Sequence, residues 1–285
     1  MRLETLKFAA GASQKLRTLG WYLQRPALYA ELVREIRRQV RQPRGVVEGR
    51  EAERWCAERA IDVASAVERL TGAPMDGRLE NHFAERMAAA VESTRRARAK
   101  EPADIGSGTP LASPMAGRAH LDLLYCLTRL FRAERVVETG VAFGWSSLAI
   151  LLAFEGKPGA RLVSTDMPIR RTSGAYVGSA VPLDLRHQWT LLRGPDRRTL
   201  PEALRTLGTI DLCHYDSDKS YDGRRWAYPL LWSHLRPGGF FVSDDINDND
   251  GFRDFATEVD VRPVVVEGPG DGRYSRYVGV LVKPA

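Results

Sequence analysis

Apolar residues follow two different rhythms along the chain. Between residues 26 and 100 they recur at steps of three and four, which is the spacing of one face of an α-helix. The first series follows Pro26, a residue suited to a first helical turn, and comprises Leu28, Tyr29, Leu32, Val33, Ile36 and Val40. Further helical runs are predicted over 51–70 and 81–100. We therefore expect a helical N-terminal region.

After residue 106 the pattern changes to short apolar runs separated by helical stretches. These runs cover 135–139, 160–166, 188–194, 209–216 and 239–245. Strands that alternate with crossover helices predict a parallel, doubly wound α/β sheet of the Rossmann-like type. The last two runs, 261–268 and 277–284, flank the turn-rich PGDGR and predict a C-terminal antiparallel hairpin.

The stretch EPADIGSGTPLASP separates the two regions, and its Pro, Gly and Ser content is typical of a connecting loop. It predicts a boundary near residue 105, between a helical N-terminal region (1–105) and an α/β domain (106–285). We expect the helical region to lie over the cleft of the domain and to join subunits in a homo-oligomer.

Composition narrows the class of protein. The longest apolar run, 148–154, is far too short to cross a bilayer, and the first residues lack a long apolar segment. We therefore expect a cytoplasmic protein with no membrane partner. The three cysteines, Cys56, Cys126 and Cys213, are far apart and are predicted to be buried free thiols.

The formal net charge of +6 raises the question of nucleic-acid binding. Residues 1–115 hold 20 Lys and Arg against 15 Asp and Glu, and residues 116–285 hold 22 against 21. The excess lies on helical segments that alternate Arg with Glu, such as ELVREIRRQVRQ, a pattern typical of solvated helix faces. The charge pattern therefore argues against a nucleic-acid partner.

Candidate chemistry begins where the first predicted strand of the domain ends, at ETGVAFGWSS. In open parallel sheets, ligands bind beyond the carboxyl ends of the strands. Gly140 and Gly144 would let the backbone approach a ligand closely, and Ser146 opens the next helix, whose free amides favour an anion. The spacing is not GxGxxG, so the loop alone is a weak signal.

Three acids accompany this loop. Asp166 ends the second predicted strand and is placed to accept ribose hydroxyls, although it could also cap the next helix. Asp196, just after the third strand, could face an adenine amino group or cap a helix. Glu138 ends a buried strand, where an unpaired carboxylate is expensive.

ETGVAFGWSS, Asp166, HYDSDKSYDG and LRPGGFFVSDDI, in this order and spacing, resemble the class I S-adenosylmethionine-dependent methyltransferases. Within that superfamily the pattern is similar to metal-dependent small-molecule O-methyltransferases, both the catechol and caffeoyl-CoA type and the macrolide-sugar and cephalosporin-tailoring type. The resemblance covers about 110–285 and implies a seven-stranded sheet.

By position, the resemblance implies a cofactor site around the glycine loop. Glu138 would lie at the methionine end of S-adenosylmethionine, with Gly140 and Gly144 around it. Ser146 would meet the cofactor carboxylate, and Asp166 would hold the ribose. Residues 113–117 resemble a segment that covers the cofactor, without a match that assigns them individually.

A second acidic group follows the fourth and fifth predicted strands. Asp216, Asp244 and Asp245 are expected at the same rim of the sheet, where they would repel one another unless protonated, separated or bound to a cation. All-oxygen ligation suits Mg²⁺, or another hard divalent ion. In the similar enzymes the matching positions are metal ligands. The pair Asp244–Asp245 departs from the Asp-Asn of the catechol type.

Lys219 matches a general base of the catechol-type enzymes, and a Lys near a metal ion can have a depressed pKa. With Asp216 it forms the predicted catalytic pair. The alternative is that Asp216 and Asp218 cap a helix and Lys219 is solvated. Asp218 is expected to have a structural or cofactor-side role, and His214 is not assigned one.

The predicted function is metal-dependent transfer of a methyl group from S-adenosylmethionine to a small-molecule hydroxyl, on a natural-product sugar, polyol or phenol. One alternative is a metal-independent methyltransferase acting on nitrogen or RNA. Another is a cofactor-binding scaffold without turnover, because a fold does not imply activity. An NAD oxidoreductase is disfavoured by the glycine spacing and the hairpin. The acceptor is not predicted by any motif.

Overall fold

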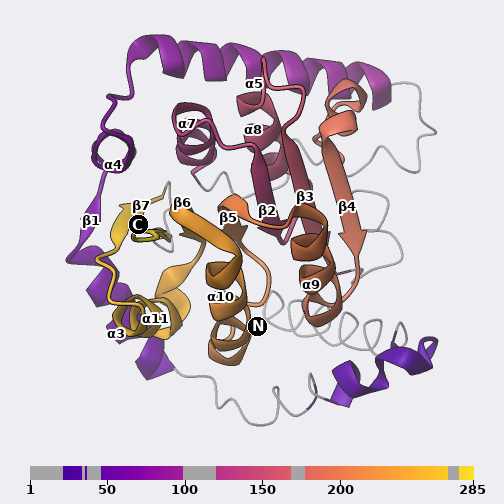
Figure 1. The fold of residues 1–285 in the computed structure, drawn as a ribbon, viewed down its shortest axis with the longest axis vertical. Helices are drawn as coiled ribbons and strands as arrows, with labels where there is room; N and C mark the ends of the chain where they lie inside the picture. The colour runs from indigo at the N-terminus through magenta and orange to yellow at the C-terminus, as the bar shows by residue number, and fades with distance from the viewer. Residues whose placement is uncertain (1–21, 34–35, 37–45, 99–119, 168–176, 269–275) are drawn as a thin grey trace, which may run out of the picture.

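The computed structural model describes residues 22–33, 36, 46–98, 120–167, 177–268 and 276–285. Its strands are β1 (Ala60–Ile61), β2 (Arg135–Thr139), β3 (Arg161–Asp166), β4 (Trp189–Arg193), β5 (Ile210–Tyr215), β6 (Leu235–Ser243), β7 (Val264–Glu267) and β8 (Tyr277–Val282). In this part of the chain they form one eight-stranded sheet, in the order β1-β7-β8-β6-β5-β2-β3-β4 (Figure 1).

Strand direction confirms the predicted α/β architecture. Every pair of neighbours is parallel except β6–β8 and β7–β8, which are antiparallel. The C-terminal hairpin therefore inserts β8 between two strands that run in the direction of the parallel sheet. The carboxyl ends of β2, β3, β5 and β6 consequently meet at one edge, as a doubly wound sheet requires.

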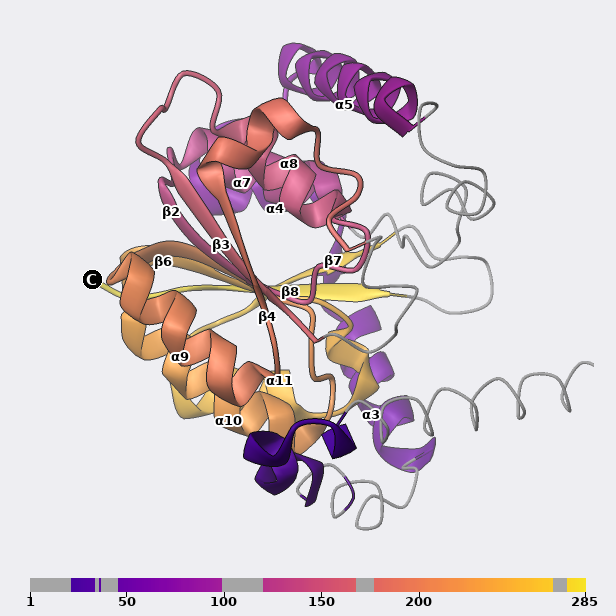
Figure 2. The same ribbon diagram turned by 90° about the vertical axis from the view of Figure 1, so that its right-hand side faces the viewer.

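Helices cover both faces of the sheet (Figure 2). One face carries α4 (Val63–Thr71), α5 (Gly77–Arg98), α7 (Leu121–Leu130) and α8 (Trp145–Ala153). The other carries α9 (Asp196–Leu207), α10 (Tyr221–His234) and α11 (Gly251–Glu258), with α3 (Val46–Ala57) packed beside η4 (Ile246–Asp248). The remaining short 3₁₀ helices are η1 (Pro26–Leu28) and η3 (Leu183–Gln188).

The central strands are buried on both faces, and alternate residues serve different cores. Val136 packs with the core on the α7–α8 side, whereas Val137 packs with the core on the α9–α10 side. Phe240 and Phe241 on β6 divide in the same way. A strand covered on both faces reads as a continuous apolar run, which explains why the sequence located these strands well.

The expected seven-stranded sheet has an eighth strand, and the helical run predicted over 51–70 is interrupted. β1 pairs in parallel with β7, with Ala60 opposite Val265. Asp62 then starts α4, because its Oδ1 accepts the amide of Ser65 at 2.9 Å. An N-cap inside an apparently continuous helical pattern ends one helix and starts the next, and the two residues before it are free to pair with the sheet edge.

Parts of the N-terminal region contact the sheet and its helices directly. β1 extends the sheet, α4 packs on α7 and β7, and α5 packs on α8. The boundary predicted near residue 105 and the segment 113–117 lie outside the described residues. No helix of the described residues is long and apolar enough to cross a membrane.

Candidate active site

The predicted site residues lie at the carboxyl edge of the sheet, on the loops that follow β2, β3, β5 and β6. The glycine loop joins β2 to α8, and Gly140 and Gly144 both have positive φ, at 79° and 88°. Gly144 is the N-cap residue of α8. A Cβ on Gly140 would overlap the backbone carbonyl of Asp216, so the glycine loop and the loop after β5 touch through their backbones.

Asp166 holds the glycine loop in place. Its Oδ2 accepts the amides of Val141 and Ala142, both at 2.9 Å. Its Oδ1 lies 3.8 Å from the guanidinium of Arg193. Burial raises the pKa of Asp166 although these two amides and Arg193 oppose the shift. The side chain therefore shapes the loop, and it keeps one oxygen free of the loop amides.

Glu138 is completely buried, and polar side chains surround it. Its Oε2 accepts hydrogen bonds from Ser147 at 2.5 Å and Ser164 at 2.6 Å. His214 stands directly opposite on β5, with Nδ1 3.5 Å from the Glu138 Oε1. Burial would raise the pKa of Glu138, but His214, Ser146 and Ser147 outweigh it and the pKa is lowered. Ser146 thus lies beside this carboxylate, at the start of α8.

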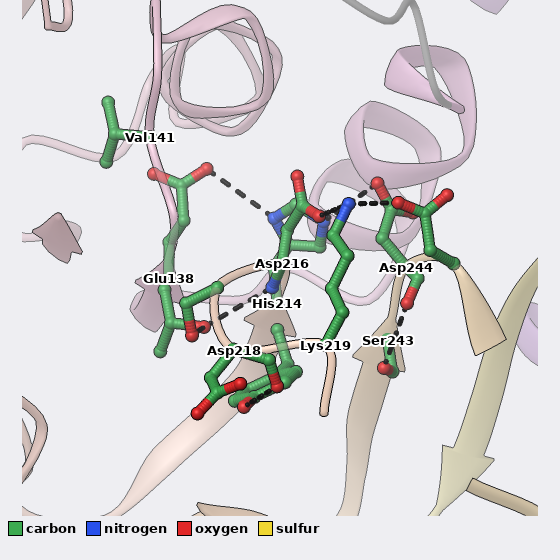
Figure 3. Close-up of polar contacts among 12 residues, drawn as sticks. Glu138, Val141, His214, Asp216, Asp218, Lys219, Ser243 and Asp244 are labelled. Atoms are coloured by element: carbon green, nitrogen blue, oxygen red, sulfur yellow. Dashed lines mark hydrogen bonds and ion pairs between the residues drawn. The ribbon is translucent and has the colours of Figure 1, made fainter. Parts of the chain in front are cut away.

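His214 lies between the two halves of the site, the cofactor half with Glu138 and Asp166 and the acidic half with Asp216, Asp244 and Asp245. Its Nε2 lies 4.0 Å from Asp244 Oδ2, on the side away from Glu138 (Figure 3). Burial would lower its pKa, yet Glu138 and Asp244 raise it to about 8. Sequence reasoning gave His214 no role. The sequence did contain a signal for this role. Residues two apart along a strand point to the same face, and His214 is two residues before Asp216. Glu138 is in register with His214 on β2.

Asp216, Asp244 and Asp245 are brought to the same edge, as predicted, and Lys219 lies between two of them. Lys219 Nζ is 3.0 Å from Asp216 Oδ1 (Figure 3). It also forms a close ion pair with Asp245. Asp244 is 8% exposed and faces His214. A protein ammonium group therefore already neutralises part of this acidic group.

The pKa values in this group follow from burial and mutual repulsion. Burial raises the pKa of Asp216 against the opposing charges of Lys219 and His214. Burial and the charge of Asp216 raise the pKa of Asp244 to about 7. Burial would lower the pKa of Lys219, but Asp216 and Asp245 raise it well above its usual range. Lys219 is an ammonium ion in this arrangement.

The donor set agrees in kind with a hard divalent ion, because three carboxylates meet at one edge and two of them are destabilised as anions. The described residues contain no group of three or more His, Cys, Asp or Glu side chains already arranged around a metal position. Lys219 occupies the space between Asp216 and Asp245. These residues could hold such an ion only after Lys219 has moved aside.

Asp196 and Asp218 complete the edge. Asp196 is the first residue of α9 rather than its N-cap, which is Pro195, so the capping alternative is wrong. Burial raises the pKa of Asp196 to about 6, and Thr165 Oγ1 lies 3.5 Å from its carboxylate. Asp218 accepts the amide of Ser220 at 3.1 Å, beside Gly223, in keeping with a structural role.

Two buried polar residues near the acidic group were not predicted. Arg224 on α10 is completely buried, and Asn249, after η4, is 9% exposed. Arg224 follows Lys219 by five residues and lies within an ordinary helical pattern. A helix-buried Arg has no sequence signature, since nothing in the pattern distinguishes it from a solvated neighbour such as Arg225.

Comparison with known proteins agrees with the fold and with the position of the site. Residues 137–246 match a family model described as a methyltransferase domain, and this range includes every site residue predicted from the sequence. Comparison with curated protein sequences gives no match. Structural similarity is seen to cofactor-bound Rv0187 from MTB, at 16% identity and a TM-score of 0.51, over 70% of this chain and 91% of that one.

Two other similar structures have lower TM-scores. One is an O-methyltransferase from Bacillus cereus in complex with SAH, at 16% identity and 0.47, covering 80% of this chain and 100% of that one. Another is TomG from Streptomyces achromogenes, an O-methyltransferase in complex with SAM, at 21% and 0.47, covering 70% and 90%. The sheet order, the glycine loop and the match of 137–246 to a methyltransferase domain agree with the class I S-adenosylmethionine-dependent methyltransferase fold that the sequence resembles.

Proposed function

We propose that the protein transfers a methyl group from S-adenosylmethionine to a hydroxyl oxygen of a small molecule, with a divalent cation held by Asp216, Asp244 and Asp245. The observation that carries this proposal is the convergence of these three carboxylates with Lys219 beside the glycine loop. The site for S-adenosylmethionine is expected around β2 and β3, so binding of the cofactor does not by itself account for these three carboxylates.

The cofactor half would bind by groups that are already oriented. The positive end of α8 would face the cofactor carboxylate, with Ser146 beside it. The Oδ1 of Asp166, which lies 3.8 Å from Arg193 and accepts from neither loop amide, would accept from the ribose. Asp196 lies farther along the edge, where the adenine is expected. Asp166 can serve both the loop and the ribose because a carboxylate has about four acceptor positions.

In the transfer itself, the methyl carbon leaves the sulfonium sulfur for the acceptor oxygen, and the electron pair of the broken C–S bond stays on sulfur. The hydroxyl proton must go to a base. A divalent ion bound by the carboxylates would lower the pKa of a coordinated hydroxyl and fix its direction. We propose that Lys219 separates from Asp216 and Asp245 when the acceptor binds and releases its own proton to solvent. The neutral amine would then accept the hydroxyl proton, which the ammonium form cannot do.

An alternative is metal-free methyl transfer, to nitrogen or to RNA. The position of Lys219 favours it, since the ammonium group supplies a positive charge between Asp216 and Asp245.

A homo-oligomer is also proposed on the basis of Tyr29, Val33 and Ile36, which lie at helical spacing and are 43%, 45% and 48% exposed.

The test is calorimetric titration of S-adenosylhomocysteine and, separately, of Mg²⁺ into chelator-treated protein. The wild type is compared with the double variant Asp244→Ala, Asp245→Ala and with Asp184→Ala, an exposed control. We expect nucleoside binding in all three and a Mg²⁺ heat in the wild type and the control only. Nucleoside binding without any Mg²⁺ heat, also in the presence of a vicinal diol, would support the metal-free alternative. Absence of nucleoside binding in the wild type would overturn the proposal.

A further inference from the structure

Arg224 is a buried cation that donates hydrogen bonds to the backbone of Asp244 and Asp245, the acidic pair. Its side chain is completely buried within α10. Its Nη2 donates to the carbonyl of Asp245 at 2.6 Å and to that of Asp244 at 3.3 Å. One guanidinium nitrogen thus binds two successive carbonyls at the point where the chain leaves β6 and turns toward η4.

Arg224 adds charged donors to a turn that has backbone support of its own. Asp245 has φ 48°, a left-handed conformation that Asp tolerates better than most residues with a side chain. Its carbonyl also accepts the amide of Asp248 at 3.1 Å, and the carbonyl of Asp244 also accepts the hydroxyl of Ser243 at 3.5 Å. The guanidinium of Arg224 reaches both carbonyls at once, so it helps to set the direction in which the Asp244 and Asp245 side chains leave the backbone.

Asn249 extends this contact to Lys219. Its Oδ1 accepts from Arg224 Nη1 at 3.1 Å and from the amide of Gly251 at 3.0 Å. Its Nδ2 donates to the backbone carbonyl of Lys219 at 2.8 Å. A Cβ on Gly251 would crowd both Asn249 and Arg224, which shows how closely the chain packs around the two side chains. The loop after β5 and the loop after β6 are therefore joined through one Arg and one Asn.

Stability alone does not explain a charge in this place. Arg224 Nε has no hydrogen-bond partner among the described residues, and a buried guanidinium with an unmade bond is destabilising relative to an apolar residue of similar volume. What a guanidinium provides, and an apolar residue or a single ammonium does not, is a planar set of donors at fixed angles. Its use here is geometrical, because it sets where two loops stand relative to each other.

We infer that Arg224 and Asn249 are positioning residues that fix Lys219 against Asp244 and Asp245. This inference rests on the proposed function for its consequence in methyl transfer. The contact itself is independent of that function. Without the two side chains, Lys219 would no longer be held between Asp216 and Asp245, and the acidic pair would lose its set direction.

The variants are chosen to separate the parts of this contact. Arg224→Met removes the donors at similar length, and Arg224→Lys keeps the charge. Asn249→Asp keeps the acceptor for Arg224 and Gly251 but loses the donor to Lys219, so it tests the link even where Arg224→Met fails to fold. Arg225→Met is the matched control, since Arg225 is the next residue of α10, is 44% exposed and pairs with Glu258.

The first readout is the rate at which N-acetoxysuccinimide acetylates Lys219 at fixed pH, followed by mass spectrometry with Lys157 and Lys283 as internal references. Loss of a partly exposed ion pair should speed Lys219 labelling by about fivefold in Arg224→Met and Asn249→Asp. Arg224→Lys should fall between these and the wild type, and Arg225→Met should match the wild type. Unchanged Lys219 labelling, or an equal rise at Lys157 and Lys283, would overturn the inference, since the latter marks general loosening.

The second readout is methyl transfer to a panel of vicinal diols, with kcat separated from the KM for S-adenosylmethionine. Displaced catalytic groups should lower kcat by about tenfold or more in Arg224→Met and leave that KM within about twofold, with partial recovery in Arg224→Lys. A variant that changes KM and kcat equally would contradict a positioning role. If the wild type methylates nothing on the panel, the proposed function fails while the labelling experiment still decides the inference.

Discussion

The two halves of the site neutralise their carboxylates in different ways. In the cofactor half, Glu138 is buried among hydroxyl donors and an in-register imidazole, and its pKa is lowered. In the acidic half, Asp216 and Asp244 have raised pKa values because burial and like charge outweigh their cationic neighbours. The donors around Glu138 are therefore in place as folded, although Asp166 and Asp196 in the same half have raised pKa values. The acidic half carries charge that a further cation would stabilise.

This difference indicates which half depends on a ligand. Fixed donors aimed at a carboxylate make a rigid site before any ligand arrives. A lysine that pairs with two carboxylates and is 37% exposed is easier to displace than a hydrogen-bond network without solvent. Mutations in the cofactor half should therefore mainly lower the free energy of unfolding. Mutations in the acidic half should mainly change ligand binding.

The largest expected effect is in the cofactor half. Glu138→Ala should lower the free energy of unfolding by about 3–5 kcal/mol, because it leaves the buried His214 and two serine hydroxyls without their partner. Urea unfolding measures this change, and calorimetry should show weaker binding of S-adenosylhomocysteine.

The matched control for this change is Glu155→Ala. Glu155 pairs with His82 and Arg129, but its side chain is 38% exposed, so its removal should change the free energy of unfolding by about 1 kcal/mol or less. Equal losses for the two variants would mean that the network around Glu138 is not a special feature of the cofactor half.

The same contrast explains what the sequence could predict. Gly140, Asp166, Asp216 and Asp244 lie at strand ends, and a parallel sheet brings all strand carboxyl ends to one edge, so topology alone predicts their convergence. The doubly wound sheet and its hairpin followed equally from apolar runs and turn residues. Local pattern was enough because each of these features repeats a short-range rule.

The features that sequence reasoning missed depend on contacts between distant elements. His214 gains its role from register with Glu138 on another strand, and Arg224 from the carbonyls of a loop twenty residues further along the chain. β1 was hidden because only its partner β7 makes Ala60 and Ile61 a strand. Propensity cannot specify such residues, since the partner decides their conformation.

A second, smaller effect concerns Asp196, at the far end of the cofactor half. Its folded pKa is about 6, above the ordinary 3.8, so the folded state holds the proton more tightly than the unfolded state does. Its contribution to stability is therefore greatest below pH 3.8, falls as the pH rises toward 6, and is constant above that.

Asp196→Asn removes this titration and should raise the free energy of unfolding by about 2–3 kcal/mol above pH 6, with little change near pH 4. Urea unfolding at several pH values measures it, with the exposed Asp184→Asn as control. Binding of S-adenosylhomocysteine should weaken in the same variant if Asp196 faces the adenine. A stability gain that does not depend on pH would show that burial of the charge is not its cause.

The smallest effect on stability is expected in the acidic half, at Asp245. Asp245→Asn removes the partner of a 37% exposed Lys219, and such pairs contribute about 1 kcal/mol or less. The turn itself should survive, because Asn tolerates the left-handed conformation that Asp245 adopts at φ 48°. Asp245→Ala removes the same charge without that tolerance, so it should unfold at lower urea than Asp245→Asn does. If Asp245→Asn instead destabilises the protein as much as Glu138→Ala, the acidic half is as complete as the cofactor half. Its carboxylates would then be structural, and a cation-dependent function would lose its main support.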